Sequence, residues 1–137
     1  MPGGETVVGR VPGGTTPRMV RPKDALGRYG EHVAAQHLEA DGFVVLERNW
    51  RCDLGELDIV AREGDVLVVC EVKTRRSMRH GSPFEAVTQR KLHRIERLGL
   101  RWMREHGVRP AAMRVDVVSV LRSASGPTVV EHVRGLR

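Results

Sequence analysis

The sequence predicts an α/β fold, in which a mixed central β-sheet is flanked by helices in the order αβββαββ. Two segments carry apolar residues at helical spacing, and five short segments are rich in valine and other strand-forming residues. Three of these strands lie between the helices and two follow them, which favours a mixed sheet with a helix on each face. The 137 residues fit one domain, and 40% of them are hydrophobic, enough for a packed core.

Both helices have recognisable ends. The first is expected from about residue 25 to residue 40, with Asp24 as its N-cap. The second is expected from about residue 89 to residue 106, with Thr88 as its N-cap and Gly107 at its end. In each segment the apolar residues recur at steps of three and four, so each helix has one face for the core.

The five strands are expected at residues 43–50, 56–61, 66–72, 113–121 and 128–133. The third begins with five apolar residues that do not alternate with polar ones, so it should lie in mid-sheet with both faces buried. Glu63, Gly64 and Asp65 form a strong hairpin signal between the second and third strands. The last strand is expected at an edge of the sheet.

Composition limits where the protein works. Residues 1–21 are rich in Gly and Pro and have no periodicity, so we expect a flexible tail before a single domain at residues 22–137. The chain has no run of 18 apolar residues and no apolar signal-peptide stretch, so no membrane association and a cytoplasmic location are expected. Cys52 and Cys70 are not at zinc-ligand spacing and are expected to be reduced thiols.

The positive charge of the chain is concentrated in one segment. The formal net charge is +6, yet residues 73–109 alone hold eleven Lys and Arg against three Glu, a net +8. A concentrated basic segment is typical of proteins that bind a polyanion. An anionic membrane surface is the other candidate, but the segment lacks the broad Trp, Phe and Leu face of an interfacial helix.

The second and third strands gather acidic side chains on one face. If residues 62–65 form the turn, Ala61 pairs with Val66, and side chains that alternate along each strand fall into two sets. Asp58 and Glu71 become diagonal neighbours, roughly 5–8 Å apart. The face toward the site carries Glu56, Asp58, Glu71 and Lys73. The face toward the core carries Leu57, Ile59, Cys70 and Val72.

Two carboxylates in such a position need compensation. At about 5 Å they repel by roughly 3 kcal/mol at an effective dielectric constant of about 20. Either one carboxyl keeps a proton, or a divalent cation such as Mg²⁺ lies between Asp58 and Glu71. In the second case Lys73 is placed to orient a water molecule or to balance charge on a phosphate. The alternative is an ion-pair network, with Lys73 bound to Glu71 or Glu56 and no catalysis.

An arginine stripe follows one side of the second helix, because Arg90, Arg94, Arg97, Arg101 and Arg104 recur at steps of four and three. The segment expected to be a loop before this helix adds Lys73, Arg75, Arg76, Arg79 and His80. The residues expected to contact nucleic acid, mainly through phosphates, are Arg75, Arg76, Arg79, Arg90, Lys91, Arg94, Arg97 and Arg101. A solvated helix face is the alternative, although the two glutamates of the helix cannot balance five arginines.

The roles of two further acidic residues are open. Glu31 on the first helix approaches the metal if that helix packs beside the sheet; otherwise it is an exposed helical residue. Asp116 lies in the Val-rich fourth strand, and its role is open. The histidines have no partners at ligand spacing, so no role is assigned to them.

Several motifs in order resemble the YraN family, also called uncharacterised protein family 0102. They are Gly27-x-x-Gly30-Glu31, Arg48-Asn49, Gly55-Glu56-Leu57-Asp58, Glu71-Val72-Lys73-Thr74-Arg75, Gly81-x-Pro83-x-Glu85-Ala86-Val87 and Lys91. The resemblance extends from about Leu26 to Val133. That family in turn resembles the PD-(D/E)xK nuclease superfamily, which has a restriction-endonuclease-like core, and the Holliday-junction resolvases of archaea. One departure is that Leu57 stands where the superfamily pattern has Pro.

The resemblance implies a set of functional residues. Asp58 and Glu71 would hold Mg²⁺ or Mn²⁺ with the help of the Val72 carbonyl, and Lys73 would position the attacking water. The acidic residue on the first helix of the resolvases maps onto Glu31. The resemblance also suggests a homodimer, because resolvase-like enzymes need two sites to cut paired strands.

Two functions from different classes follow. The first is a divalent-metal-dependent DNA endonuclease that hydrolyses phosphodiesters, acting on branched or single-stranded DNA in repair or recombination. The second is a non-catalytic module that binds nucleic acid, with DNA favoured over RNA, and assists a helicase or another repair protein. The intact set of Asp58, Glu71 and Lys73 favours the enzyme, because a module that only binds does not need two crowded carboxylates.

Overall fold

The structure is a computed structural model that describes residues 23–77 and 87–137. Its elements are α1 (Ala25–Ala40), β1 (Val44–Cys52), β2 (Gly55–Glu63), β3 (Val66–Arg75), α2 (Gln89–His106), β4 (Ala112–Leu121) and β5 (Val129–Val133). This is the predicted order αβββαββ, and it is consistent with a restriction-endonuclease-like core. The expected tail at residues 1–21 lies outside the described residues.

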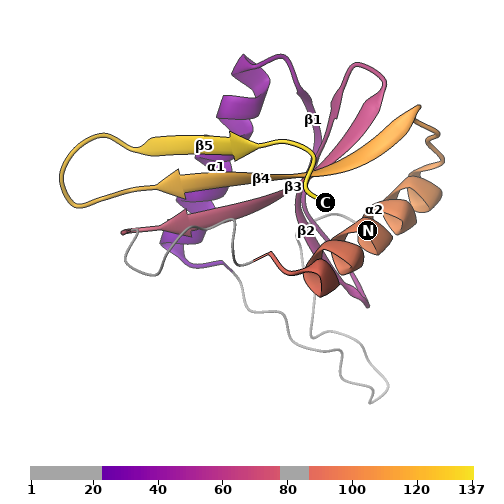
Figure 1. Cartoon of the computed structure of the whole chain (residues 1–137), viewed down its shortest axis with the longest axis horizontal. Helices are drawn as coiled ribbons and strands as arrows, with labels where there is room; N and C mark the ends of the chain where they lie inside the picture. The colour runs from indigo at the N-terminus through magenta and orange to yellow at the C-terminus, as the bar shows by residue number, and fades with distance from the viewer. Residues whose placement is uncertain (1–22, 78–86) are drawn as a thin grey trace.

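The five strands form one mixed sheet in the order β1-β2-β3-β4-β5 (Figure 1). β3 and β4 are parallel, because α2 carries the chain from one end of the sheet back to the other. The other three neighbouring pairs are antiparallel. β3 is the central strand, and Leu67–Cys70 are buried in it, as the run of apolar residues predicted.

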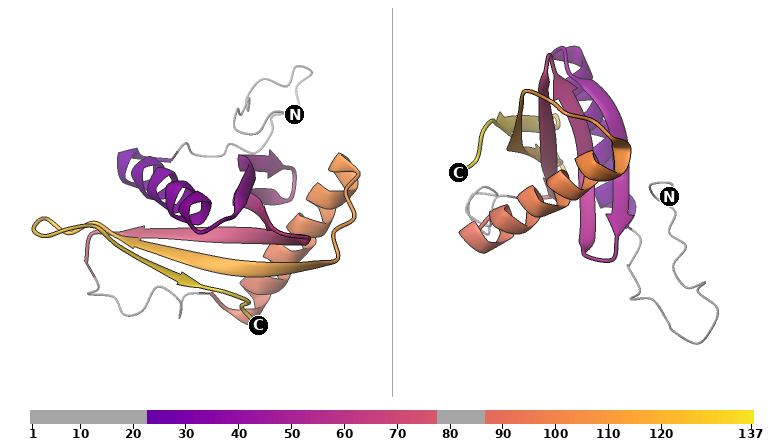
Figure 2. Two further views of the ribbon diagram at one scale, coloured as in Figure 1. Left: turned by 90° about the horizontal axis from the view of Figure 1, so that it is seen from above. Right: turned by 90° about the vertical axis from the view of Figure 1, so that its right-hand side faces the viewer.

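The two helices cover opposite faces of the sheet (Figure 2). On one face α1 packs through Ala34 and Leu38 against Ile59, Val68 and other strand residues. On the other face α2 packs through residues such as Leu92 and Ile95 in a second cluster. Both clusters consist mainly of Val, Leu, Ile and Ala, with Trp50 and Trp102 as the large side chains of the α2 cluster.

Both helices begin and end as the sequence predicts. Asp24 caps α1, since its Oδ1 accepts a hydrogen bond of 2.8 Å from the backbone N–H of Gly27. Thr88 caps α2, with its Oγ1 3.1 Å from the backbone nitrogen of Lys91. Gly107 ends α2 in the left-handed region, at a φ of 66°, where a residue without Cβ is unstrained.

The hairpin between β2 and β3 has a different register from the one expected. Val66 pairs with Glu63 instead of Ala61, so the turn is the two residues Gly64 and Asp65. Gly64 permits this tighter turn because it has a φ of 59°. The register moves by two residues, and a shift of two residues does not by itself move a side chain to the other face of the sheet. The predicted gathering of Glu56, Asp58, Glu71 and Lys73 therefore does not depend on the error.

Two other details differ from expectation. Lys73 and Arg75 belong to β3 and not to a loop, because β3 continues its parallel pairing with β4 as far as Arg75 and Leu121. Leu57 packs in the α2 cluster and not with Ile59 in the α1 cluster. Leu57 is paired with Trp50, next to Asn49, whose φ of 55° marks an irregular point in β1.

Gly30 lets α1 approach the sheet closely at the point where Glu31 faces β3. A Cβ added to Gly30 would lie 1.9 Å from Oγ1 and 2.6 Å from Cγ2 of Thr74. No side chain larger than hydrogen fits there without movement of α1 or Thr74. The close contact fixes the height of α1 above β3 and therefore the position of the side chain that follows Gly30.

We expect Gly30→Ala to lower the free energy of unfolding by about 1–3 kcal/mol, although alanine is the better helix former. Urea unfolding of the wild type, Gly30→Ala, Thr74→Ala and the double variant would measure the coupling between the two positions. Because Thr74→Ala removes two of the clashing atoms, the double variant should recover part of the loss. Additive effects of the two substitutions would show that the contact does not set the approach of α1.

Candidate metal and nucleic-acid site

Asp58 and Glu71 lie together on neighbouring strands and line one pocket of about 300 Å³. The β2–β3 pairing of Ile59 with Cys70 sets the two acidic residues side by side, one position further along each strand. α2 forms the opposite wall of the pocket with Lys91, Arg94 and apolar side chains. The predicted carboxylate pair therefore lies at a hollow that opens toward the basic helix.

Burial and mutual repulsion dominate the electrostatics of the pair. Asp58 is 8% exposed, and its burial and then the charge of Glu71 raise its pKa from 3.8 to about 6. Contacts with Lys23 and with the backbone N–H of Val72, which is 2.8 Å from Oδ2, oppose this rise in pKa. Two anionic carboxylates at this position are thus costly near neutral pH unless further positive charge is supplied.

Two lysines contact the second carboxylate. The Oε2 of Glu71 lies 3.4 Å from Nζ of Lys73 and 3.1 Å from Nζ of Lys91. Burial and the neighbouring Lys91 lower the pKa of Lys73. Burial opposes the charged form of Lys91 as well, but contact with Lys73 and attraction to Glu71 raise its pKa. Lys91, predicted to contact nucleic acid, therefore belongs to the carboxylate pocket itself.

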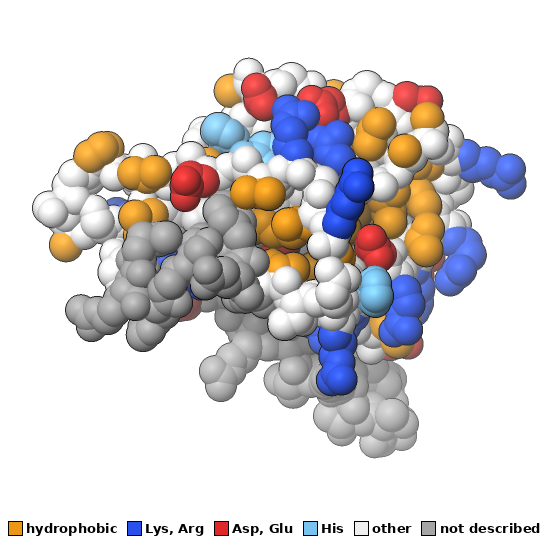
Figure 3. Space-filling model, viewed as in Figure 1, with side chains coloured by type: hydrophobic (Ala, Val, Ile, Leu, Met, Phe, Trp, Pro, Cys, Tyr) orange, Lys and Arg blue, Asp and Glu red, His pale blue; other side chains and the backbone are white. Residues whose placement is uncertain are grey.

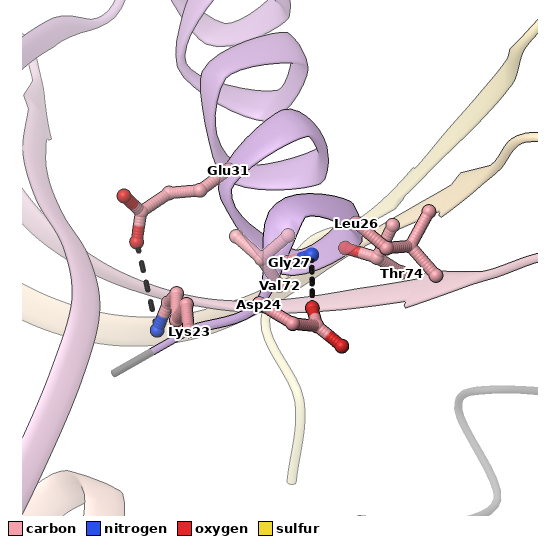
Figure 4. Close-up of a pocket in the computed structure, with 7 residues that line it drawn as sticks. All are labelled: Lys23, Asp24, Leu26, Gly27, Glu31, Val72 and Thr74. Carbon is pink, nitrogen blue, oxygen red and sulfur yellow. Dashed lines mark hydrogen bonds and ion pairs between the residues drawn. The ribbon is translucent and has the colours of Figure 1, made fainter. Parts of the chain in front are cut away.

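Lys23 is part of the site and was missed from the sequence. Its Nζ lies 2.9 Å from Oδ1 of Asp58 and 3.4 Å from Oε2 of Glu56. It is also 3.7 Å from Oε2 of Glu31, across a pocket of about 250 Å³ next to the start of α1 (Figure 4). Lys23 precedes the helix by two residues and follows the expected tail, so neither periodicity nor a motif distinguished it.

Glu31 is buried at the inner side of α1, only 2% exposed, and is not an exposed helical residue. Its Oε1 accepts hydrogen bonds from Asn49 at 2.7 Å and from Arg48 at 3.2 Å. Its Oε2 has no hydrogen-bond partner within residues 23–77 and 87–137, although a buried carboxylate oxygen normally has one. The Arg48-Asn49 motif of β1 thus holds one oxygen of Glu31, and the other is left facing Lys23.

The oxygen atoms around Lys23 are of the type that a hard divalent cation binds. Mg²⁺ commonly uses one or two carboxylates and completes its shell with waters and substrate phosphates. Asp58 and Glu71 supply the two carboxylates, and Oε2 of Glu31, which has no hydrogen-bond partner among the described residues, is a further buried oxygen next to Lys23. Within residues 23–77 and 87–137, no three His, Cys, Asp or Glu side chains are arranged as a ready metal-binding group.

The predicted arginine stripe is exposed over part of its length. Arg90, Arg94 and Arg97 are exposed and, with His93, line a hollow of about 370 Å³ on α2. Arg94 also lines the carboxylate pocket, so the two hollows share a wall. Several basic side chains are seen in the right-hand part of the space-filling view, where α2 lies (Figure 3).

Other members of the basic set are placed differently. Arg101 is half-buried and pairs with Asp53 and Glu105, both at 2.8 Å. Arg75 lies at the end of β3, and Arg76 is exposed just beyond it. Arg79 falls outside the described residues. In the part of the chain that the structure describes, the exposed basic surface near the pocket thus consists mainly of Arg90, Arg94 and Arg97 in the first half of α2.

Asp116 lies in a buried hydrogen-bond network. It is completely buried and accepts hydrogen bonds from Arg114 at 3.0 Å, His132 at 2.8 Å and the backbone of Gly135 at 2.9 Å. These contacts outweigh burial and lower the pKa of Asp116. Asp116 joins β4 to β5 and the residues after it, and it is not one of the acids that line the carboxylate pocket.

Cys52 and Cys70 are free thiols, and burial and the charge of Asp116 raise the pKa of Cys70 above its ordinary range. Neither α1 nor α2, the helices of the described part of the chain, is both long and apolar enough to cross a membrane.

Comparison with known proteins identifies the family. The sequence profile of the uncharacterised protein family UPF0102 matches residues 30–120. A UPF0102 protein of Nocardioides sp. is 56% identical over 114 residues, which cover 83% of this chain and 92% of that protein. One of Beutenbergia cavernae is 56% identical over 117 residues, 85% of this chain and 99% of that protein. One of Frankia alni is 57% identical over 116 residues, 85% and 97% of the two chains. The chain therefore belongs to the UPF0102 family, the YraN family that its motifs resemble.

Proposed function

We propose that this protein is a divalent-metal-dependent endonuclease that hydrolyses phosphodiester bonds in DNA. The observation that carries the proposal is one pocket in which Asp58 and Glu71 lie side by side, opposite Lys91 and Arg94 of a basic helix. Crowded carboxylates attract a cation, and a basic wall attracts a polyanion. Metal-dependent hydrolysis of phosphodiester bonds uses both features.

In this proposal Asp58, Glu71 and the carbonyl of Val72 hold Mg²⁺ or Mn²⁺. Held there, such an ion would supply the positive charge needed to polarise the scissile phosphate and to lower the pKa of a water molecule. Asp58 is oriented for its role by the backbone N–H of Val72, which holds Oδ2 and fixes the plane of the carboxylate. Glu31 is a further buried acidic residue, and it is linked to Asp58 through their shared contact with Lys23.

The two lysines on Glu71 have separate roles. Lys73 is half-buried, and its lowered pKa makes it the better of the two for sharing a proton with the attacking water. Lys91 keeps its charge more firmly and projects from α2, so it balances negative charge that develops on the phosphate. Their common contact with Glu71 keeps both amines at the same wall of the pocket.

The substrate reaches the pocket along α2. Arg94 borders both the carboxylate pocket and the hollow formed by Arg90 and Arg97, so a phosphate chain in that hollow leads to Asp58 and Glu71. Arginine contacts to phosphates carry affinity but little sequence information. We therefore propose that the enzyme selects DNA by its shape, as a branched or single-stranded substrate would require.

A binding module without catalysis is the second candidate. It is favoured by the amines already in contact with each acid, since Lys23 pairs with Asp58 and both Lys73 and Lys91 pair with Glu71. Such a network compensates the carboxylates without a metal. The two candidates share the basic helix and differ only in whether DNA is cut.

We expect the wild-type protein with Mn²⁺ to cut at least one of a panel of flap, fork, four-way-junction and single-stranded DNAs. Lys73→Ala should lower the cleavage rate by about 100-fold or more, because positioned proton transfer typically contributes at least this factor. Asp58→Asn and Glu71→Gln should be inactive. Arg62→Ala, at the far end of β2, is the matched control and should cut as the wild type does. If wild type and Lys73→Ala are equally inert on every substrate, the protein is not a nuclease on these DNAs and the binding module remains.

We expect the double variant Arg94→Glu/Arg97→Glu to bind DNA more weakly than wild type. The slope of the logarithm of its binding constant against the logarithm of the salt concentration should be smaller in magnitude by about two, one for each lost phosphate contact. Fluorescence anisotropy with a labelled oligonucleotide at several salt concentrations would measure both quantities. Arg62→Glu gives the same kind of charge reversal away from α2 and should change the slope little. An unchanged slope in the double variant would remove this surface from the DNA path.

The proton on Asp58 competes with a metal ion and affects stability. The folded protein binds this proton more tightly than the unfolded chain, since the pKa is about 6 in place of 3.8. Ionisation of Asp58 therefore costs folding free energy as the pH rises from about 4 to about 7. In Asp58→Asn this cost is absent.

We expect the difference in unfolding free energy, Asp58→Asn minus wild type, to increase over that pH interval by up to about 3 kcal/mol without metal. Urea unfolding in a chelator at a series of pH values would measure it. Mn²⁺ should stabilise wild type more at pH 7 than at pH 5 and should leave Asp58→Asn nearly unaffected. A difference that does not change with pH would mean that Asp58 is not held with a raised pKa.

A further inference from the structure

The amine of Lys23 lies where three acidic side chains from two elements meet. Asp58 and Glu56 approach it from β2, and Glu31 approaches it from α1, at distances between 2.9 and 3.7 Å. We propose that Lys23 is an internal counter-ion of the metal site, which occupies the place of the cation and is displaced when a divalent ion binds. The inference rests on the proposed function, since it concerns the same carboxylates.

The contact of Lys23 with Asp58 and the binding of a metal to the same oxygen exclude each other. Nζ is 2.9 Å from Oδ1 of Asp58, and a bound Mg²⁺ would lie about 2.0–2.1 Å from a carboxylate oxygen. Two positive centres that share one oxygen would stand only a few ångströms apart in a partly buried pocket, where their repulsion is weakly screened. The amine must therefore move away when the ion enters.

The position of Lys23 in the chain allows this movement. It lies before the N-cap of α1, in a segment without regular structure, so its side chain can turn away without breaking a helical hydrogen bond. Its backbone remains anchored, because the carbonyl accepts a hydrogen bond of 2.7 Å from Nη1 of Arg28. The side chain is 20% exposed, so solvent is directly accessible to a displaced amine.

Oε2 of Glu31 supports the view that the amine of Lys23 satisfies only some of the acidic oxygens around it. This buried oxygen is 3.7 Å from Nζ, beyond hydrogen-bond distance, and it has no other partner among the described residues. An ammonium group offers three hydrogens from one centre and is held by Asp58 and Glu56. A dication with its waters could satisfy Glu31 as well, and monovalent cations would gain little by the exchange.

Calorimetric titration of Mn²⁺ into wild type, Lys23→Met and Arg62→Met would test the proposal. Methionine keeps much of the side-chain volume and removes the charge, and Arg62→Met removes one charge on β2 away from the pocket. Lys23→Met should bind Mn²⁺ at least about tenfold more tightly than wild type, because the competing charge is gone. Without metal it should melt at a lower temperature than wild type, and saturating Mn²⁺ should restore a larger part of its stability. Arg62→Met should bind as the wild type does.

The outcomes separate this inference from the proposed function. If wild type and Lys23→Met bind Mn²⁺ with equal affinity, or if the variant binds more weakly, Lys23 is not a competing counter-ion, while the metal site itself stands. If neither protein binds Mn²⁺, the metal-dependent function and this inference fall together.

A second measurement does not require the variant to be stable. The side-chain Cε signal of Lys23 in wild type, assigned by its absence in Lys23→Met or Lys23→Arg, should shift when Mg²⁺ is added to saturation. A signal that stays in place while Mg²⁺ binds would overturn the proposal.

Discussion

The repulsion between the carboxylates of buried Asp58 and half-buried Glu71 is the constraint on which the arrangement of the site depends. Neighbouring positions on β2 and β3 bring the two acids together, and burial raises the pKa of Asp58 to about 6. Three nearby lysines compensate part of this repulsion with their positive charge. Lys23 arrives from the segment before α1, Lys73 from β3 and Lys91 from α2. Lysines from three separate parts of the chain thus meet at the two carboxylates, because a buried negative charge needs a positive partner.

Uncharged contacts between the helices and the sheet position the charged side chains of the site. Gly30 brings α1 against Thr74 of β3, and the side chain of Glu31 reaches Arg48 and Asn49 of β1 from the buried side of the helix. Asn49, in an unusual backbone conformation, then holds one of its oxygens. The network of Asp116, Arg114 and His132 is separate and joins β4 to β5. Buried polar groups in this protein therefore serve two distinct purposes, one at the site and one in the fold.

Much of the fold could be predicted because its signals are local. The caps Asp24 and Thr88, the apolar run of β3 and the glycine of the hairpin each depend on a few neighbouring residues. The grouping of Asp58, Glu71 and Lys73 on one face followed from strand alternation and survived a register error of two residues. Lys23, the burial of Glu31 and the position of Lys91 depend on how α1 and α2 dock on the sheet. No local pattern encodes these tertiary contacts, and they were found only in the structure.

The rigidity of α2 has a consequence for how this surface would meet a nucleic acid. The helix is anchored on the sheet by buried Leu92, Ile95 and Trp102, so the backbone positions of the arginines on its outer side are fixed relative to one another. Arg90 and Arg97 are seven residues apart, which corresponds to about 10 Å along a helix axis. If α2 contacts nucleic acid as proposed, these arginines would present positive charge at a fixed backbone spacing, and a bound strand would have to adapt its path to that spacing.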